Sequence, residues 1–293
     1  MSFYYKIKPL LKNTIPDRLL YYYYKSRRQH HLIPNEHLQF DVHLAEHCNV
    51  NCAGCNHFSP LAEPEFTDLS VLNKDFARLA EIFGRKVRYV NLMGGEPLLH
   101  PQINDCLRAA RRHFTKSTLN VVTNGLLVSS QKEDFWQTCR ENQIIIFISR
   151  YPIKLDFDKI SATANKNLVE LKFYGRTQEE MRNFRRVPLD LSGQQNKDLS
   201  FVMCNRANAC IALNNGRLFT CQTAAYIEHF NKFFQQNLAL SPNDYIDIYK
   251  AQSAEEILNF LANPIPFCRF CNLKGKLDDL GWRTSEKNMA EWV

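Results

Sequence analysis

Two hydrophobic patterns alternate along residues 39–185. Short apolar runs, which predict buried strands, occur at 39–45, 87–92, 118–123, 144–148 and 168–174. Apolar positions spaced three and four residues apart, which predict helices, occupy 70–83, 101–113, 131–142, 156–165 and 177–185. Apolar strands separated by helices indicate parallel βα units with helices outside, and about six such units fit before residue 200. We therefore expect an α/β domain over 38–200.

The pattern differs at both ends of the chain. Residues 1–37 form an arm with a predicted helix at 16–28. Beyond residue 200, the Asn214-Asn215-Gly216 turn predicts a hairpin over 211–220. A further helix is expected at 253–262. We expect residues 201–293 to form a separate small domain.

Three cysteines follow the first predicted strand in the stretch Cys48-Asn-Val-Asn-Cys52-Ala-Gly-Cys55. Thiolates with three and then two residues between them suit three corners of a [4Fe–4S] cube, which leaves one iron without a protein ligand. The alternative is a structural zinc site completed by His47 or His57, although zinc sites favour paired C-x2-C units.

A second motif, Gly94-Gly95-Glu96-Pro97, ends the second predicted strand. Together with the three cysteines it resembles the radical S-adenosylmethionine (SAM) superfamily, over about residues 38–200. The resemblance implies a partial (β/α)6 barrel with the chemistry at the carboxyl ends of its strands. It also implies a SAM site that includes Gly94, Gly95, Glu96, Pro97, Asn124 and Ser149, in which Glu96 supports the SAM amino group.

In that superfamily a reduced [4Fe–4S] cluster, here held by Cys48, Cys52 and Cys55, passes an electron to SAM. The resulting 5′-deoxyadenosyl radical removes a hydrogen atom from the substrate. Many members place an aromatic residue just before the third cysteine, against adenine, where this chain has Gly54. We expect His57 or Phe58 to supply that contact.

The C-terminal cysteines resemble a second known arrangement. Cys210-x10-Cys221, with Gly216 five residues before Cys221, is similar to the opening of the SPASM domain of radical SAM maturases. Its shortened form, called Twitch, binds one auxiliary [4Fe–4S] cluster. The resemblance implies that the auxiliary ligands are Cys204, Cys221, Cys268 and Cys271, or a set that includes Cys210. A zinc ribbon on the same thiolates is the alternative.

The odd cysteine suggests a catalytic hypothesis. If Cys210 is the spare thiol, it donates a hydrogen atom to the substrate, as in radical SAM epimerases. Cys106 and Cys139 fall in predicted outer helices, where a free cysteine behaves as a small hydrophobe, and we interpret both as structural.

The composition, 45% hydrophobic and 23% charged, is typical of a globular protein, and no apolar run is long enough for a membrane span. Ten cysteines without a signal peptide indicate metal or redox chemistry in the cytoplasm rather than a disulfide framework. Most of the net charge of +7 lies in residues 1–31, among several tyrosines. This arm either packs over the barrel or contacts an acidic membrane surface or a protein. Nucleic-acid binding is not expected, since no reading module accompanies the charge.

A single auxiliary cluster in a short Twitch-like enzyme suggests that the substrate is a small polar molecule, best fitted by a carbohydrate, which is dehydrogenated or epimerised. An electron donor such as flavodoxin or ferredoxin is expected. One alternative is a peptide-modifying radical SAM maturase, although such enzymes usually carry a leader-binding domain larger than the 37 residues before the barrel. The other is a non-catalytic Fe–S or zinc scaffold protein.

Overall fold

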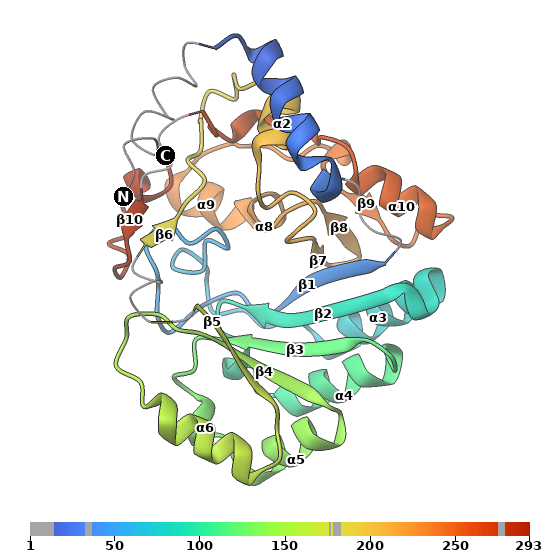
Figure 1. Cartoon of the computed structure of the whole chain (residues 1–293), viewed down its shortest axis with the longest axis vertical. Helices are drawn as coiled ribbons and strands as arrows, with labels where there is room; N and C mark the ends of the chain where they lie inside the picture. Colours follow the sequence, from blue (N-terminus) through green and yellow to red (C-terminus); the bar gives the residue numbers. More distant parts are fainter. Residues whose placement is uncertain (1–14, 33–36, 176, 178–182, 275–278) are drawn as a thin grey trace.

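A computed structural model describes residues 15–32, 37–175, 177, 183–274 and 279–293. Its centre is an eight-stranded sheet in the order β5-β4-β3-β2-β1-β7-β8-β9 (Figure 1). The strands are β1 (Leu38–Ala45), β2 (Val87–Gly94), β3 (Thr118–Thr123), β4 (Ile144–Ser149), β5 (Leu171–Tyr174), β7 (Ala212–Asn214), β8 (Arg217–Phe219) and β9 (Ile246–Asp247). The chain is therefore a mixed α/β protein, as predicted.

Parallel pairing dominates the sheet. β1 to β5 run parallel in consecutive order, and β7 adds to the free side of β1, also in parallel. β8 and β9 continue from β7 in antiparallel fashion, so the predicted hairpin over 211–220 is present.

Four helices connect the first five strands, one between each consecutive pair of strands. They are α3 (Leu69–Phe83), α4 (Ile103–His113), α5 (Glu133–Glu141) and α6 (Phe157–Lys166). The Asp68 side chain caps α3 by accepting hydrogen bonds from the amides of Ser70 and Val71, and Gly84 follows the last turn. The predicted helix at 253–262 is also present, as α10 (Ala254–Leu261), capped by Ser253.

Two expectations about the strands and helices need correction. The region before residue 200 supplies five parallel strands rather than six within its described part, and the sixth, β7, comes from beyond residue 200. The helix expected at 177–185 is wrong at its end, because Asn183–Arg185 forms strand β6, paired with β10 (Asp279–Gly281). The rest of that helix lies mostly outside the described residues. Pairing with a distant strand overrides the local periodicity there.

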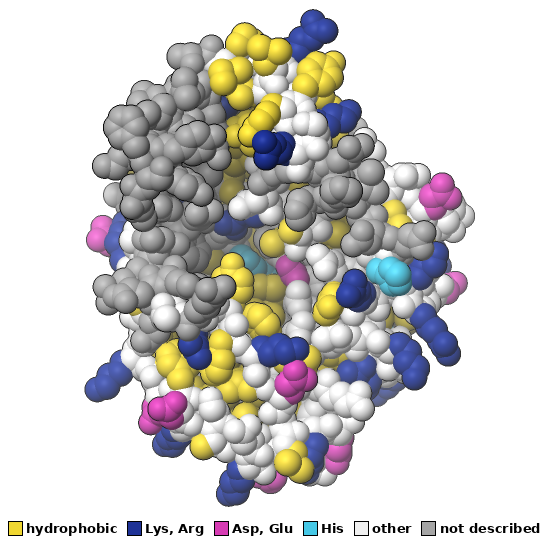
Figure 2. All heavy atoms as spheres, in the orientation of Figure 1, with side chains coloured by type: hydrophobic (Ala, Val, Ile, Leu, Met, Phe, Trp, Pro, Cys, Tyr) yellow, Lys and Arg dark blue, Asp and Glu magenta, His cyan; other side chains and the backbone are white. Residues whose placement is uncertain are grey.

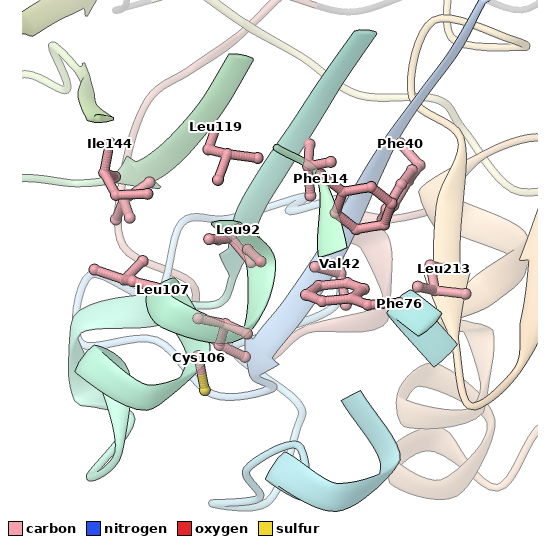
Figure 3. Close-up of a cluster of buried hydrophobic side chains, with 14 of the residues drawn as sticks. Phe40, Val42, Phe76, Leu92, Cys106, Leu107, Phe114, Leu119, Ile144 and Leu213 are labelled. Atoms are coloured by element: carbon pink, nitrogen blue, oxygen red, sulfur yellow. The ribbon is translucent and has the colours of Figure 1, made fainter. Parts of the chain in front are cut away.

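The main hydrophobic core lies between the sheet and helices α3, α4 and α5. Alternate residues of β1, Phe40 and Val42, face this core, where the ring of Phe40 meets Phe76 of α3 and Phe114 (Figure 3). Leu213 of β7 belongs to the same cluster, so the C-terminal region contributes directly to the core of the α/β region.

A second core lies on the other side of the molecule, within the upper part of Figure 1. It joins α2 (Asp17–Leu32), α7 (Lys197–Met203), α8 (Gln222–Ala225), α9 (Ile227–Phe234) and the short 3-10 helix η6 (Pro266–Phe270). The helix predicted at 16–28 is α2, which contacts α7. None of the described helices combines the length and the apolar character needed to cross a bilayer.

Candidate active site

The residues expected to form the site meet at one edge of the sheet. Cys48, Cys52 and Cys55 lie in the loop after β1, and Gly94 ends β2. Asn124 follows β3, and Ser149 is the last residue of β4. Parallel strands bring their carboxyl ends together, which explains why segments one hundred residues apart converge here.

These residues line a single cavity of about 730 Å³. A cavity of this size can hold a cofactor or a substrate of moderate size. The predicted residues in its wall are Cys48, Cys52, Cys55, Gly94, Gly95, Asn124, Ser149 and Cys210. Glu96 and Pro97 are not among the residues that line it.

Gly94 and Gly95 allow the end of β2 to pack directly on the start of the cysteine loop. The Gly95 amide donates to the Ala45 carbonyl at 2.8 Å, and the Glu96 amide donates to the His47 carbonyl at 3.0 Å. A Cβ on Gly95 would lie 2.0 Å from the His47 oxygen, and one on Gly94 would lie 2.3 Å from the Ala45 oxygen. The glycine pair is therefore required by the close approach of the two backbone segments.

Glu96 connects this loop to the end of β3 from a fully buried position. Its carboxyl group accepts hydrogen bonds from the Thr123 hydroxyl at 2.7 Å, the Asn124 amide at 2.9 Å and the Leu98 amide at 3.1 Å. Burial raises the pKa of Glu96 to about 7, against these hydrogen bonds, which lower it. Glu96 acts here as a positioning residue for Asn124.

Asn124 in turn reaches the cysteine loop. Its side-chain amide donates to the Asn49 side-chain oxygen at 2.7 Å and lies 3.7 Å from the Cys48 sulfur. The Val50 amide also donates to that sulfur, at 3.4 Å. Burial raises the pKa of the Cys48 thiol to about 11.

The C-terminal segment closes over the cysteine loop, a contact that the sequence analysis did not anticipate. The Trp282 indole donates to the Cys52 sulfur at 3.1 Å, and the Trp292 indole donates to the Cys55 carbonyl at 2.9 Å. The Ala53 amide donates to the Arg283 carbonyl, so backbone bonds join the two segments as well. The only signal of this contact in the sequence is that two of the three tryptophans lie near the C-terminus.

A partly buried histidine network adjoins the cavity. The His43 ring on β1 contacts His57 at 2.7 Å and Glu46 at 3.0 Å, and Glu46 also meets His229 at 2.9 Å. Burial acts to raise the pKa of Glu46, but His43 and His229 hold it well below its usual range. Burial and then the charge of His43 lower the pKa of His57.

The two aromatic candidates for the adenine contact separate in the structure. His57 lines the cavity. Phe58 is buried in the second core against Phe230 and Trp292, away from the cavity wall. Tyr151 and Tyr174, which the sequence analysis did not select, also line the cavity.

Four of the C-terminal cysteines gather away from the cavity wall. Cys204 ends α7, Cys221 precedes α8, and Cys268 and Cys271 lie in and just after η6. Each of the last three has its thiol pKa raised first by burial and then by neighbouring cysteines of this group. The backbone amide of Arg206 donates to the Cys204 sulfur at 3.4 Å.

Cys210 differs from these four because it lines the cavity together with the three loop cysteines. Burial raises the pKa of its thiol to about 12. Arg206, four residues earlier in the same turn, accepts a hydrogen bond from the Cys210 amide through its carbonyl and lines the same cavity. Cys106 and Cys139 are fully buried in α4 and α5, as predicted.

The chemistry of both donor sets fits Fe–S clusters. Thiolates are the ligands of such clusters, and N–H groups directed at sulfur, as at Cys48 and Cys52, stabilise the charge that a cluster carries. Within the described residues, no three histidine, cysteine or carboxylate side chains are arranged to hold one metal ion. A cubane binds each thiolate through a different iron, so its ligands lie farther apart than those of a single ion.

Comparisons with known proteins identify similar chains, although no protein-family profile matches this one. GTP 3′,8-cyclase of Chlorobaculum tepidum is 34% identical over 84 residues, 29% of this chain. The match spans about a quarter of the cyclase (24%). The solved structure of native anSMEcpe with bound AdoMet aligns over 80% of this chain and 82% of that chain, with a TM-score of 0.49 and 14% identity. The structure of BtrN in complex with AdoMet and 2-DOIA aligns over 80% of this chain and 93% of that chain, with a TM-score of 0.47 and 14% identity.

Proposed function

We propose that this chain is a radical SAM enzyme that removes a hydrogen atom from a small polar substrate. One observation carries the proposal: the three loop cysteines, Gly94-Gly95, Asn124 and Ser149 line one cavity at the carboxyl ends of β1 to β4. The sequence similarity to GTP 3′,8-cyclase supports the radical SAM resemblance of the two motifs.

In this proposal Cys48, Cys52 and Cys55 hold a [4Fe–4S] cluster. With SAM bound, such a cluster supplies the one-electron cleavage that yields a 5′-deoxyadenosyl radical. The chain positions these groups through Asn124, which is fixed by Glu96, and through the indole of Trp282, which is directed at the Cys52 sulfur. Gly94 and Gly95 leave bare backbone at the cavity wall for the methionine part of SAM.

The rest of the cavity favours a substrate rich in hydroxyl or amide groups. Asn56, Ser59, Asn205 and Arg206 add hydrogen-bonding side chains to the wall. A carbohydrate fits this lining, and we propose that its dehydrogenation or epimerisation is the reaction. The electron source in this proposal is a small donor protein such as flavodoxin or ferredoxin.

The test is reductive cleavage of SAM. The full chain, reconstituted anaerobically with iron and sulfide, is mixed with dithionite and SAM, and 5′-deoxyadenosine is measured by chromatography. We expect product from the natural chain and none from Cys52→Ala, whereas Cys139→Ala, which alters a buried thiol in α5, retains activity. Failure of the natural chain to form 5′-deoxyadenosine with its clusters loaded would overturn the proposal.

The auxiliary site is part of the same proposal. In this proposal Cys204, Cys221, Cys268 and Cys271 ligate a second [4Fe–4S] cluster. The Cys271 thiol lies near enough to the other three to feel their charge, whereas Cys210, which also feels Cys204 and Cys221, lines the cavity. We expect about eight irons and eight sulfides per chain, the content of two cubes. Substitution of Cys268 and Cys271 by alanine is expected to halve both numbers, and bound zinc in their place would contradict the assignment.

Cys210 completes the proposal as the donor of a hydrogen atom. Its S–H bond would break to give that atom to a substrate carbon radical, and one electron from the reductant with one proton from solvent would restore the thiol. The lining position of Cys210 supports this role over cluster ligation. With Cys210→Ala we expect both clusters to remain and the return of hydrogen to the substrate to fail. If Cys210→Ala in deuterated water still formed the same product, with one solvent deuterium at a carbon of inverted configuration, Cys210 would be excluded as the hydrogen donor.

A further inference from the structure

Helix α2 carries an exposed apolar stripe that no part of the proposed reaction uses. Leu19, Tyr22 and Tyr23 are 61%, 58% and 47% exposed, and Ile15, just before the helix, is 37% exposed. The spacing of three and four residues places Leu19, Tyr22 and Tyr23 along one side of the helix, and Ile15 precedes them. Figure 2 shows hydrophobic side chains gathered over α2, at the top of the molecule, next to Lys and Arg side chains.

The opposite side of α2 fixes the helix to the protein. Leu20 is buried in the second core, and Tyr21 and Tyr24 pack against that core. Asp17 forms an ion pair with Lys274. The stripe is thus presented outward on a helix that is already anchored.

Positive charge borders the stripe on both sides. Arg18 and Lys25 lie along one edge and Arg27 along the other, by their positions around the helix, and all three are exposed. The Lys25 ammonium is 5.4 Å from the Tyr21 ring, and the Arg27 guanidinium is 5.4 Å from the Tyr23 ring. The single carboxylate between residues 15 and 27, Asp17, is engaged by Lys274.

We propose that α2 docks the protein on the surface of a bilayer that contains anionic phospholipid. Leucine and tyrosine side chains insert at the level of the headgroups, where tyrosine is enriched, and long cationic side chains on both edges reach lipid phosphates. The charge complementarity and the two-sided basic border favour a lipid surface over a protein groove. The helix lies in the interface and does not cross the membrane.

The proposal is tested by sedimentation of the full chain, purified anaerobically, with vesicles. Vesicles of phosphatidylcholine mixed with phosphatidylglycerol are compared with vesicles of phosphatidylcholine alone. We expect binding to the anionic vesicles only, with release as the salt concentration rises.

Leu19→Glu/Tyr22→Glu is expected to abolish binding. Lys25→Gln/Arg27→Gln is expected to weaken it about 25-fold, from about fivefold for each cation near the surface.

Matched controls lie on and beside α6, remote in sequence from α2. Leu168→Glu replaces another exposed leucine, 78% exposed, and Lys159→Gln/Lys166→Gln removes two exposed cations. Both controls are expected to bind as the natural chain does. Three results would overturn the proposal: equal binding to neutral and anionic vesicles, no binding to either kind of vesicle, or a loss of binding in the control variants equal to that in the α2 variants. So would a concentration-dependent dimer that the α2 variants abolish, since a second copy would then cover the stripe. If Leu19→Glu/Tyr22→Glu does not fold, Lys25→Gln/Arg27→Gln still tests the proposal, because both of its substituted side chains are exposed.

Discussion

At the scale of single residues, the site depends on side chains that are small or absent as much as on reactive ones. The cysteines are recognisable in the sequence because ligand spacing is a local property. Glu96 shows the limit of that approach, since its burial beneath Asn124 and its three hydrogen-bond donors follow only from the folded geometry.

Gly95 offers the sharpest test at this scale. In Gly95→Ala the new methyl group would meet the His47 carbonyl at 2.0 Å, so the cysteine loop must move away from β2. We expect a loss of about 1–3 kcal/mol in the free energy of unfolding and a large drop in bound iron. Gly281→Ala, where a Cβ meets no atom within 4 Å, serves as the control. Full iron content and unchanged stability in Gly95→Ala would contradict the described packing.

At the scale of elements, the period of the hydrophobic pattern predicts where strands and helices occur. It does not predict which strands pair or which helices pack together. The apolar run at 144–148 predicts β4 without any knowledge of the fold. By contrast, nothing near Asn183 indicates that it pairs with Gly281, and nothing near Cys52 indicates Trp282, 230 residues later. Pairing between distant segments is decided by the total packing, which local patterns do not contain.

The contact between the C-terminal segment and the cysteine loop can be tested through Trp282. Trp282→Phe keeps a ring to stack on Tyr151 but removes the N–H bond to the Cys52 sulfur. Such a bond favours the reduced cluster, so its loss is expected to make the midpoint potential about 40 mV more negative, equivalent to about 1 kcal/mol. An electron paramagnetic resonance titration measures this shift. Trp136→Phe, which changes a core ring in α5, is expected to leave the potential unaltered.

At the scale of the whole molecule, the regions before and after residue 200 share one sheet. β7 pairs with β1, and Asp41 of β1 accepts hydrogen bonds from Asn91 of β2 at 2.6 Å and from Gln222 of α8 at 2.7 Å. The sequence predicts a separate small domain after residue 200 because the hydrophobic pattern changes there and half of the cysteines follow. That boundary stays a prediction, since a local pattern does not show which strands lie side by side.

Asp41 makes global stability depend on pH. Burial raises its pKa to about 6, from 3.8, against hydrogen bonds that lower it. The folded state therefore binds more protons than the unfolded state between these two values, so this contribution is complete below pH ~4 and is lost as the pH rises through about 6.

Asp41→Asn removes this titration. We compare the free energy of unfolding of the variant with that of the natural chain by urea unfolding. Between pH ~4 and pH ~7 we expect this difference to shift by about 3 kcal/mol in favour of the variant. Asp158→Asn, at an exposed carboxylate in α6, is the control and is expected to show no such trend. A constant difference between Asp41→Asn and the natural chain across this range would contradict the assignment.

The late partner of the cysteine loop has a consequence for biosynthesis. A ribosome completes residues 48–55 early, yet the indole that caps Cys52 emerges 230 residues later. Throughout that interval the nascent thiols lack their cover and can react with oxidants or stray metals. We therefore expect the cluster to be inserted after the finished polypeptide has left the ribosome. When iron is scarce, full-length folded chains without a cluster should accumulate.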